Sequence, residues 1–178
     1  MVTITRNLQQ KIVENMKSNK VVLIFGARRV GKTVLLNQIA QQFTGKVLMM
    51  NGEDYDTLAL LENRSISNYK NLLQDVNLLL IDEAQHIPDI GAKLKLMVDE
   101  VQGIKILVSG SSSLDLFNKS GEPLVGRSVP FHLTPFSQTE ISQTENRLQT
   151  QQNLETRLIY GSYPEVVLWR PSNSGKNT

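Results

Sequence analysis

Four short apolar runs recur along the chain at nearly regular intervals, and they limit the folds that it can adopt. They cover residues 21–25, 47–50, 78–81 and 104–108. Near-continuous apolar runs of this length are typical of parallel strands covered on both faces, and a spacing of roughly 30 residues is that of repeated βαβ units. Residues with helical periodicity lie before and between the runs, which predicts a doubly wound α/β sheet flanked by helices. These are Leu8, Ile12, Val13 and Met16, then Leu35, Leu36, Ile39, Ala40 and Phe43, and later Ile90, Leu94, Met97, Val98 and Val101.

The pattern changes after the fourth run. Val129, Phe131 and Leu133 alternate as in a fifth strand, which Pro135 ends. A stretch rich in Gln, Thr and Glu follows at 137–155 and indicates polar helices and loops, and the last residues are polar throughout. We therefore expect a core with a five-stranded parallel sheet at 1–136, a partial helical lid or linker at 137–169, and a disordered tail at 170–178.

A glycine-rich octet directly follows the first apolar run. It matches G-x-x-x-x-G-K-[ST] in full and lies between a predicted strand and a predicted helix, as a P-loop requires. In such a loop backbone N–H groups surround phosphate oxygens, and the following helix directs its positive end at the same anion. Lys32 is expected to reach the β- and γ-phosphates and Thr33 to bind Mg²⁺, whereas Arg28 and Arg29 are expected to be solvated at the tip. The predicted nucleotide site comprises Gly26, Ala27, Arg28, Arg29, Val30, Gly31, Lys32, Thr33 and Val34.

Two carboxylates follow the third apolar run. Asp82 ends this run, and its carboxylate is predicted to hold Mg²⁺ together with Thr33. Glu83 is predicted to polarise the attacking water as a general base, so the sequence predicts Mg-dependent ATP hydrolysis as well as binding. A further strand lies between the octet and Asp82 in sequence. This arrangement differs from GTPase-like P-loop folds, in which the strand of the aspartate adjoins that of the P-loop.

Composition bears mainly on location and partners. The chain has no cysteine, and its 19 basic and 17 acidic residues give a net charge of +2. A chain without thiols suits a reducing cytoplasm, and the longest early apolar run is far shorter than the roughly 18 residues of a membrane span. We therefore expect a cytoplasmic protein without a membrane segment. The nearly balanced charge gives no support to nucleic-acid binding.

Several motifs together resemble one family. The segments G-A-R-R-V-G-K-T, L-L-I-D-E-A-Q, V-S-G-S-S-S, L-V-G-R and L-T-P-F-S-Q-T-E resemble the bacterial and archaeal AAA-type ATPases whose core precedes a C-terminal domain of unknown function. The resemblance runs from about Arg6 to Val167 and includes Y-G-S-Y-P-E-V-V, which in that family leads into the C-terminal domain. It implies that the chain is truncated, and no arginine of a lid can be matched.

The resemblance also implies roles for three further residues. The fourth strand of AAA-type proteins ends in a polar sensor of the γ-phosphate, here Ser111 or Ser109, although the same serines could instead cap a short helix at 114–117. Arg127 lies where such ATPases often carry an arginine that acts across a subunit interface, which implies a homo-oligomer. The alternative is a surface arginine.

Two other functions remain open. The chain could be a nucleotide-binding regulatory switch with little hydrolysis, because its lid and effector domain are missing. Asp82-Glu83-Ala84-Gln85 also resembles a helicase box and the ATP-dependent transposition regulators, which leaves a DNA-linked ATPase as the second alternative. What the ATPase acts on is not encoded in these motifs.

Overall fold

The five strands form one parallel sheet. The computed structural model describes residues 4–111 and 124–168. In the sheet the strands follow the order β2-β3-β4-β1-β5, and each adjacent pair is parallel, as predicted. The strands are β1 (Val21–Phe25), β2 (Val47–Asn51), β3 (Leu78–Asp82), β4 (Lys105–Gly110) and β5 (Ser128–His132).

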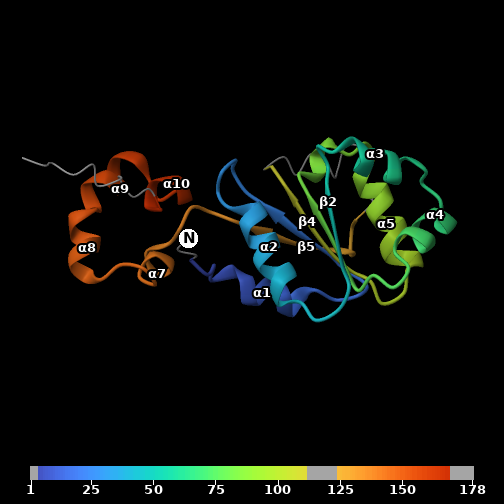
Figure 1. Ribbon diagram of the computed structural model, residues 1–178, viewed down its shortest axis with the longest axis horizontal. Helices are drawn as coiled ribbons and strands as arrows, with labels where there is room; N and C mark the ends of the chain where they lie inside the picture. The colour runs from blue at the N-terminus through green and yellow to red at the C-terminus, as the bar shows by residue number, and fades with distance from the viewer. Residues whose placement is uncertain (1–3, 112–123, 169–178) are drawn as a thin grey trace, which may run out of the picture.

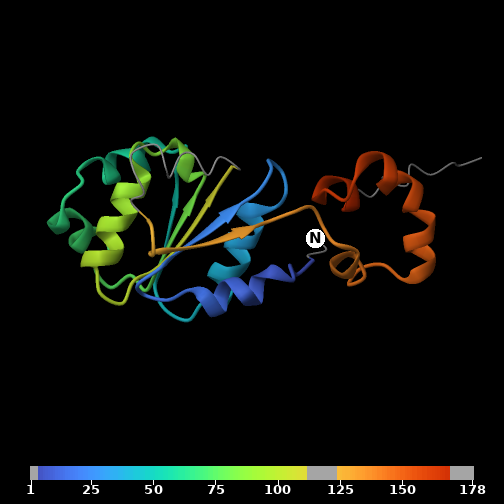
Figure 2. The same cartoon turned by 180° about the vertical axis from the view of Figure 1, so that it is seen from behind.

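Helices cover both faces of this sheet, which confirms the three-layer architecture (Figures 1 and 2). On one side lie α1 (Leu8–Asn15) and α2 (Lys32–Gln42). On the other lie α3 (Tyr55–Glu62), α4 (Ile66–Leu72) and α5 (Ile90–Glu100), with the short 3₁₀ helix η1 (Ala84–His86) after β3. Val101, which we expected inside a helix, is the C-cap of α5. Val13, which belongs to the predicted apolar stripe of α1, is 48% exposed and does not face the core.

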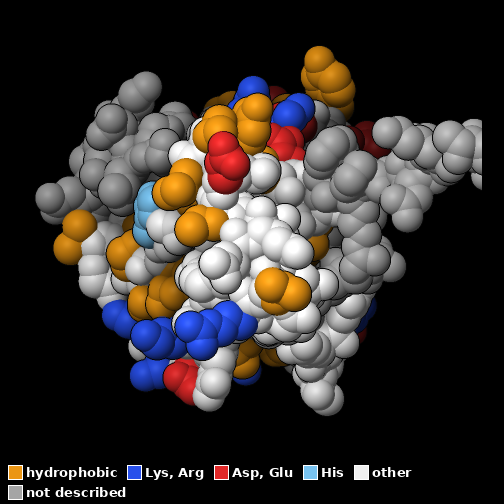
Figure 3. All heavy atoms as spheres, turned by 90° about the vertical axis from the view of Figure 1, so that its left-hand side faces the viewer, with side chains coloured by type: hydrophobic (Ala, Val, Ile, Leu, Met, Phe, Trp, Pro, Cys, Tyr) orange, Lys and Arg blue, Asp and Glu red, His pale blue; other side chains and the backbone are white. Residues whose placement is uncertain are grey.

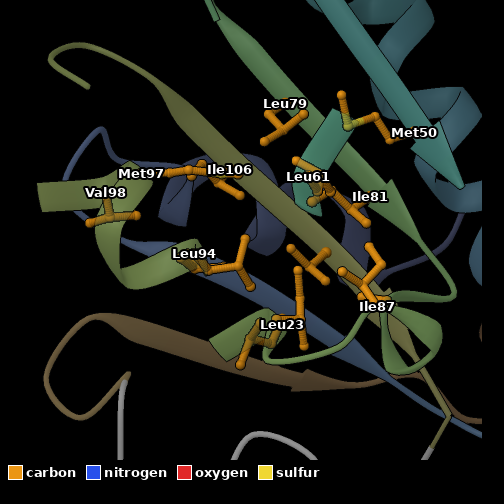
Figure 4. Packing of buried hydrophobic residues seen from close by; sticks show 14 of the residues in the cluster. Leu23, Met50, Leu61, Leu79, Ile81, Ile87, Leu94, Met97, Val98 and Ile106 are labelled. Carbon is orange, nitrogen blue, oxygen red and sulfur yellow. The ribbon is translucent and has the colours of Figure 1, made fainter. Parts of the chain in front are cut away.

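The apolar runs divide between two hydrophobic cores because successive side chains of a strand point to opposite faces. In β1, Leu23 and Phe25 join the core under α3, α4 and α5, whereas Val22 and Ile24 join the core under α1 and α2. Figure 4 shows the first of these cores, in which Leu23 lies near side chains from β3, β4 and α5. Burial on both faces explains the unbroken apolar runs of β1, β3 and β4, whereas in the edge strand β2 only Met50 is buried.

The register brings the carboxyl ends of the strands to one edge of the sheet. Phe25 of β1 is paired with Gly110 of β4 and with His132 of β5, and Asp82 of β3 is paired with Asn51 of β2. In the sheet, β4 separates the P-loop strand from the strand of Asp82. As in the predicted arrangement, the strand of Asp82 does not adjoin the P-loop strand. The strand between them in the sheet is β4, whereas β2, which comes between the two motifs in sequence, lies at the edge.

The C-terminal part forms a helical appendage at one end of the molecule (Figure 1). None of the residues in α8, α9 and α10 is buried, and Leu154, Leu158 and Tyr160 are exposed. Figure 3 looks onto this end and shows hydrophobic side chains dispersed among polar ones. The helices are α7 (Gln138–Ile141), α8 (Arg147–Gln152), α9 (Leu154–Tyr160) and α10 (Pro164–Val167).

Some expectations lie outside the described residues, namely the short helix at 114–117 and the tail at 170–178. Among the residues that are described, no helix is both long and apolar enough to cross a membrane.

Candidate nucleotide-binding site

The glycine-rich octet forms a loop between β1 and α2, with both glycines at positions that need them. A Cβ atom on Gly26 would overlap the carbonyl oxygen of Leu133, so the loop leaves β1 in close contact with the end of β5. Gly31 has a φ of 101°, a left-handed conformation that glycine adopts without strain. Arg29 at the loop tip is also left-handed, with a φ of 62°. The chain therefore folds tightly back before α2 begins.

The loop offers free N–H groups next to a buried cation. Helix α2 begins at Lys32, and in the described part of the chain the amides of residues 31–34 donate no hydrogen bond. These are the unpaired donors of a helix N-terminus, where anions bind. Lys32 is 4% exposed, and its Nζ donates hydrogen bonds of 3.1 Å to the carbonyl oxygens of Gly26 and Ala27. This donor set fits the phosphate groups of a nucleotide.

Asp82 connects the P-loop to the third and fourth strands. Its Oδ2 accepts a hydrogen bond of 2.5 Å from the Thr33 hydroxyl, and its Oδ1 accepts from the Ser109 hydroxyl and, at 3.0 Å, from the Glu83 amide. The structure thus brings together the two residues predicted to bind Mg²⁺, although they are 49 positions apart in sequence. Two protein oxygens fit an ion that usually keeps several of its waters.

The two candidate sensor serines have different surroundings. Ser109 lies within β4, is 1% exposed and orients Asp82. Ser111 follows the strand and is partly exposed, and its amide donates a hydrogen bond of 3.1 Å to Oε1 of Gln85. Ser111 is therefore the more accessible of the two.

Glu83 is held in an unusual backbone conformation beside Asp82. Its φ of 49° is left-handed, and its side chain accepts a hydrogen bond from Nε2 of Gln85. Since Oε1 of Gln85 accepts from the Ser111 amide, this glutamine bridges the candidate base and the candidate sensor. Our sequence analysis assigned no role to Gln85, although its position in the D-E-A-Q motif was a signal.

The P-loop has a further support that sequence reasoning missed. Arg6 is buried, and its guanidinium donates to the carbonyl oxygen of Val30 at 3.1 Å and to that of Thr134. It also forms an ion pair of 3.2 Å with Glu140 and lies 4.4 Å from the centre of the Phe136 ring. Burial lowers the pKa of Arg6, while Glu140 acts in the opposite direction. The only signal in the sequence was that Arg6 begins the segment resembling the family.

Arg127 lies away from this site, at the opposite edge of the sheet. Its carbonyl oxygen accepts a hydrogen bond from the amide of Val21 at the start of β1, whereas the P-loop follows the end of β1. A strand of this length spans about 16 Å. The side chain forms a half-exposed ion pair of 2.7 Å with Asp99. Arg127 therefore cannot reach the nucleotide site of its own subunit in this arrangement.

A parallel sheet with this strand order, a P-loop after β1 and an aspartate at the end of β3 define a P-loop NTPase fold. Residues 18–142 match the model of a family described as an AAA domain. Because the match spans more than half of the sequence, the chain belongs to the AAA domain family.

Curated relatives are longer than this chain. An uncharacterized protein of Methanocaldococcus jannaschii is 25% identical over 187 residues, which cover 97% of this chain and 41% of that protein. Uncharacterized proteins of Mycobacterium tuberculosis and Mycobacterium bovis are each 30% identical over 155 residues, which cover 84% of this chain and 33% of theirs. The chain therefore spans less than half the length of these relatives.

A solved structure shares the fold. The Orc1 protein of Aeropyrum pernix, in complex with DNA, superimposes with a TM-score of 0.54 at 14% sequence identity. The match covers 87% of this chain and 50% of that one. At this identity the similarity concerns the fold alone.

Proposed function

We propose that this domain binds Mg-ATP and hydrolyses it. The observation that carries the proposal is the 2.5 Å hydrogen bond between Thr33 Oγ1 and Asp82 Oδ2, next to the buried ammonium of Lys32. It joins the helix that follows the P-loop to the carboxyl end of β3, where the two motifs need to meet around one Mg²⁺ ion. Membership of the AAA domain family supports the same function.

Each side chain of the site has a distinct proposed role. In the proposed reaction water adds to the γ-phosphorus of bound Mg-ATP, the bond to the bridging β,γ-oxygen breaks, and ADP and inorganic phosphate are released. Lys32 neutralises charge on the β- and γ-phosphates, and Thr33 and Asp82 hold the Mg²⁺ ion. Glu83 accepts a proton from the attacking water, and Ser111 donates a hydrogen bond on the side of the γ-phosphate.

The position of Glu83 suits a general base. Glu83 is partly exposed, so water can reach it, and the hydrogen bond from Gln85 limits the orientation of its carboxylate. Asp82 is in contrast buried and accepts three hydrogen bonds, which leaves it unsuited to proton transfer. The two neighbouring carboxylates thus have different environments, and we assign the metal to Asp82 and the proton to Glu83.

The proposal is tested by Lys32→Ala with titration calorimetry of Mg-ATP. We expect ATP binding to be lost, because the ammonium is the mobile charge that faces the phosphates. Lys95→Ala is a matched control. Lys95 is exposed on α5, so this substitution removes the same charge far from the P-loop. Equal ATP affinity in Lys32→Ala and in the control would contradict the proposed site.

A DNA-linked ATPase is the second candidate, because the Orc1 protein that shares the fold is in complex with DNA. Stimulation of ATP turnover by duplex DNA would favour this candidate, whereas unchanged turnover at low salt would count against it. A regulatory switch is distinguished by single-turnover kinetics, in which the bound ATP would persist without being hydrolysed.

A further inference from the structure

The turn at Tyr163, Pro164 and Glu165 lies on the outer side of the P-loop. The carboxylate of Glu165 forms an ion pair of 3.0 Å with the guanidinium of Arg29 at the loop tip. Cγ of Pro164 lies 3.7 Å from where a Cβ atom of Gly31 would be. Figures 1 and 2 agree in placing α10 beside the loop that precedes α2. The turn therefore forms an ion pair with the tip of the nucleotide-binding loop and lies close to Gly31 of the same loop.

The same turn is attached to the buried support behind the P-loop. The carbonyl oxygen of Ser162 accepts a hydrogen bond of 2.9 Å from the amide of Phe136, whose ring packs beside Arg6. Tyr163 packs against the core that includes Val30, and Val167 packs against the cluster that includes Phe136. Arg6 in turn donates to the carbonyl oxygen of Val30. The turn is therefore connected to the P-loop from its inner side as well as at its tip.

The ion pair with Glu165 involves Arg29, the P-loop residue whose backbone conformation is least favourable. In the P-loop, Arg29 and Gly31 have positive φ angles, of 62° and 101°. Gly31 adopts this conformation freely, but a residue with a Cβ atom does so at a cost in free energy. An interaction that fixes Arg29 in this conformation favours the loop shape in which the amides of residues 31–34 face an anion.

We propose that Glu165 is a positioning residue for the nucleotide site, and that docking of the turn at residues 162–167 and binding of ATP stabilise each other. The proposal rests on the function proposed above. If the docked turn favours the loop shape that binds phosphate, then bound phosphate must favour the docked turn by the same factor. The turn at residues 162–167 thereby responds to bound nucleotide.

The expected effect is small, because the ion pair is exposed. The side chains of Arg29 and Glu165 are 77% and 56% exposed, so solvent screens their attraction. Pairs of this kind change an equilibrium by about two- to fivefold. Calorimetry resolves a difference of this size, and a general loss of folding would be far larger.

A double-mutant cycle tests the proposal. ATP affinity is measured for the wild type, Arg29→Gln, Glu165→Gln and the double variant. We expect Glu165→Gln to weaken ATP binding by about two- to fivefold in the wild type, and to have no further effect when Arg29 is already glutamine. Glu100→Gln is the matched control, because it removes the exposed Lys70–Glu100 ion pair far from the P-loop. Equal ATP affinity in the wild type and Glu165→Gln would overturn the proposal, as would equal effects in both backgrounds.

Hydrogen exchange gives a second readout that a merely structural role would not change. The Phe136 and Val167 amides donate hydrogen bonds to the carbonyl oxygens of Ser162 and Tyr163. We expect ATP to slow hydrogen exchange at these two amides, and to slow it less in Glu165→Gln than in the wild type. Exchange at these amides that does not depend on ATP would overturn the proposal. If the wild type itself does not bind ATP, the proposed function fails, and this result differs from normal ATP binding without coupling.

Discussion

At the scale of single residues, the site depends on how Glu83 is held. Its φ of 49° is unfavourable for a residue with a side chain, so the surrounding structure must compensate. The Gly52 amide donates a hydrogen bond of 2.8 Å to the carbonyl oxygen of Asp82, the residue before Glu83, and Gln85 contacts the Glu83 side chain. The backbone before Glu83 is thus held by the residue after β2, and its side chain by Gln85 of η1.

Glu83→Gln is expected to retain ATP binding and to lose turnover. The amide keeps the size of the side chain but cannot accept the proton of water, and loss of a general base lowers a rate by about 10² to 10⁴-fold. ATP affinity from calorimetry and phosphate release under steady-state conditions provide the two measurements. Turnover equal to that of the wild type would remove Glu83 from the mechanism.

Gly52→Ala is expected to impair turnover more than ATP binding. A Cβ atom at this position would overlap the carbonyl oxygen of Glu83, so the backbone that carries the proposed base must move. A displacement of this kind costs about 1–3 kcal/mol of stability and misplaces the base. Thermal unfolding and the separate values of kcat and KM measure the two effects.

Gly103→Ala serves as the control for Gly52→Ala. Gly103 has a φ of 78° in the loop before β4, and nothing lies within 4 Å of a Cβ atom built there. This substitution strains the backbone but leaves Glu83 in place, so stability should fall without a change in kcat. A fall in kcat in both variants would show that Gly52 has no specific link to the base.

At the scale of elements, the sequence predicted what depends on local pattern. The apolar patterns of β1, β3, β4, α2 and α5 agree with their burial, whereas Val13 of α1 and Met49 of the edge strand β2 are exposed. We did not predict helices α3 and α4. Asp54 and Ser65 cap their N-termini, and these capping residues in the sequence could have indicated where the two helices begin. The contacts of Arg6 with Glu140 and of Arg29 with Glu165 join residues 134 and 136 positions apart, and no local pattern indicates pairs at that distance.

Tyr69 provides a test of packing between α3 and α4. Its ring is fully buried, and its hydroxyl donates a hydrogen bond of 3.4 Å to the carbonyl oxygen of Leu61. Burial raises the pKa of Tyr69, while Arg64 acts in the opposite direction. Because the folded state binds the phenolic proton more tightly, Tyr69 contributes stability below its unfolded pKa of about 10 that is lost as the pH rises further.

Tyr69→Phe should therefore reduce the alkaline sensitivity of stability. At neutral pH the variant loses at most about 0.5–1.5 kcal/mol with its hydrogen bond, and above pH 10 this difference from the wild type should shrink or reverse. Burial lowers the pKa of Lys93, which affects stability in the opposite sense, but Lys93 is present in both proteins and cancels in the comparison. Urea unfolding at pH 8 and pH 10.5 measures the difference, and an equal difference at both values would contradict the assignment.

At the scale of the whole molecule, segments from both ends of the chain meet behind the nucleotide site. Ile4 packs with Phe136 and Ile141, and Arg6 bridges the P-loop and α7 through Val30 and Glu140. Residues that are distant in sequence therefore form one small cluster, and Arg6 connects it to the proposed ATP-binding loop by its hydrogen bond to the carbonyl oxygen of Val30. Arg6 thus contacts the P-loop and the first helix of the appendage at the same time.

The opposite edge of the molecule carries Arg127, for which we propose a role between subunits. The length of β1 separates it from its own P-loop, so any action on ATP must take place on the site of a neighbouring copy. A guanidinium supplied in this way neutralises charge on the γ-phosphate in the transition state and is worth about 10³ to 10⁵ in rate. Its ion pair with Asp99 is half-exposed, so it can exchange partners at modest cost.

Mixing two inactive variants tests this role. Arg127→Ala should bind ATP normally but hydrolyse it slowly, because it lacks the guanidinium supplied to the neighbouring site. Glu83→Gln should also bind ATP and hydrolyse it slowly, because it lacks the general base. In mixed assemblies some interfaces pair an intact Glu83 site with an intact Arg127, so activity should partly return at concentrations where light scattering detects association. Arg147→Ala, which removes an exposed arginine of α8, should turn over at the wild-type rate. If associated mixtures stay inactive while the wild type turns over, Arg127 has no role in trans, and its ion pair with Asp99 is structural.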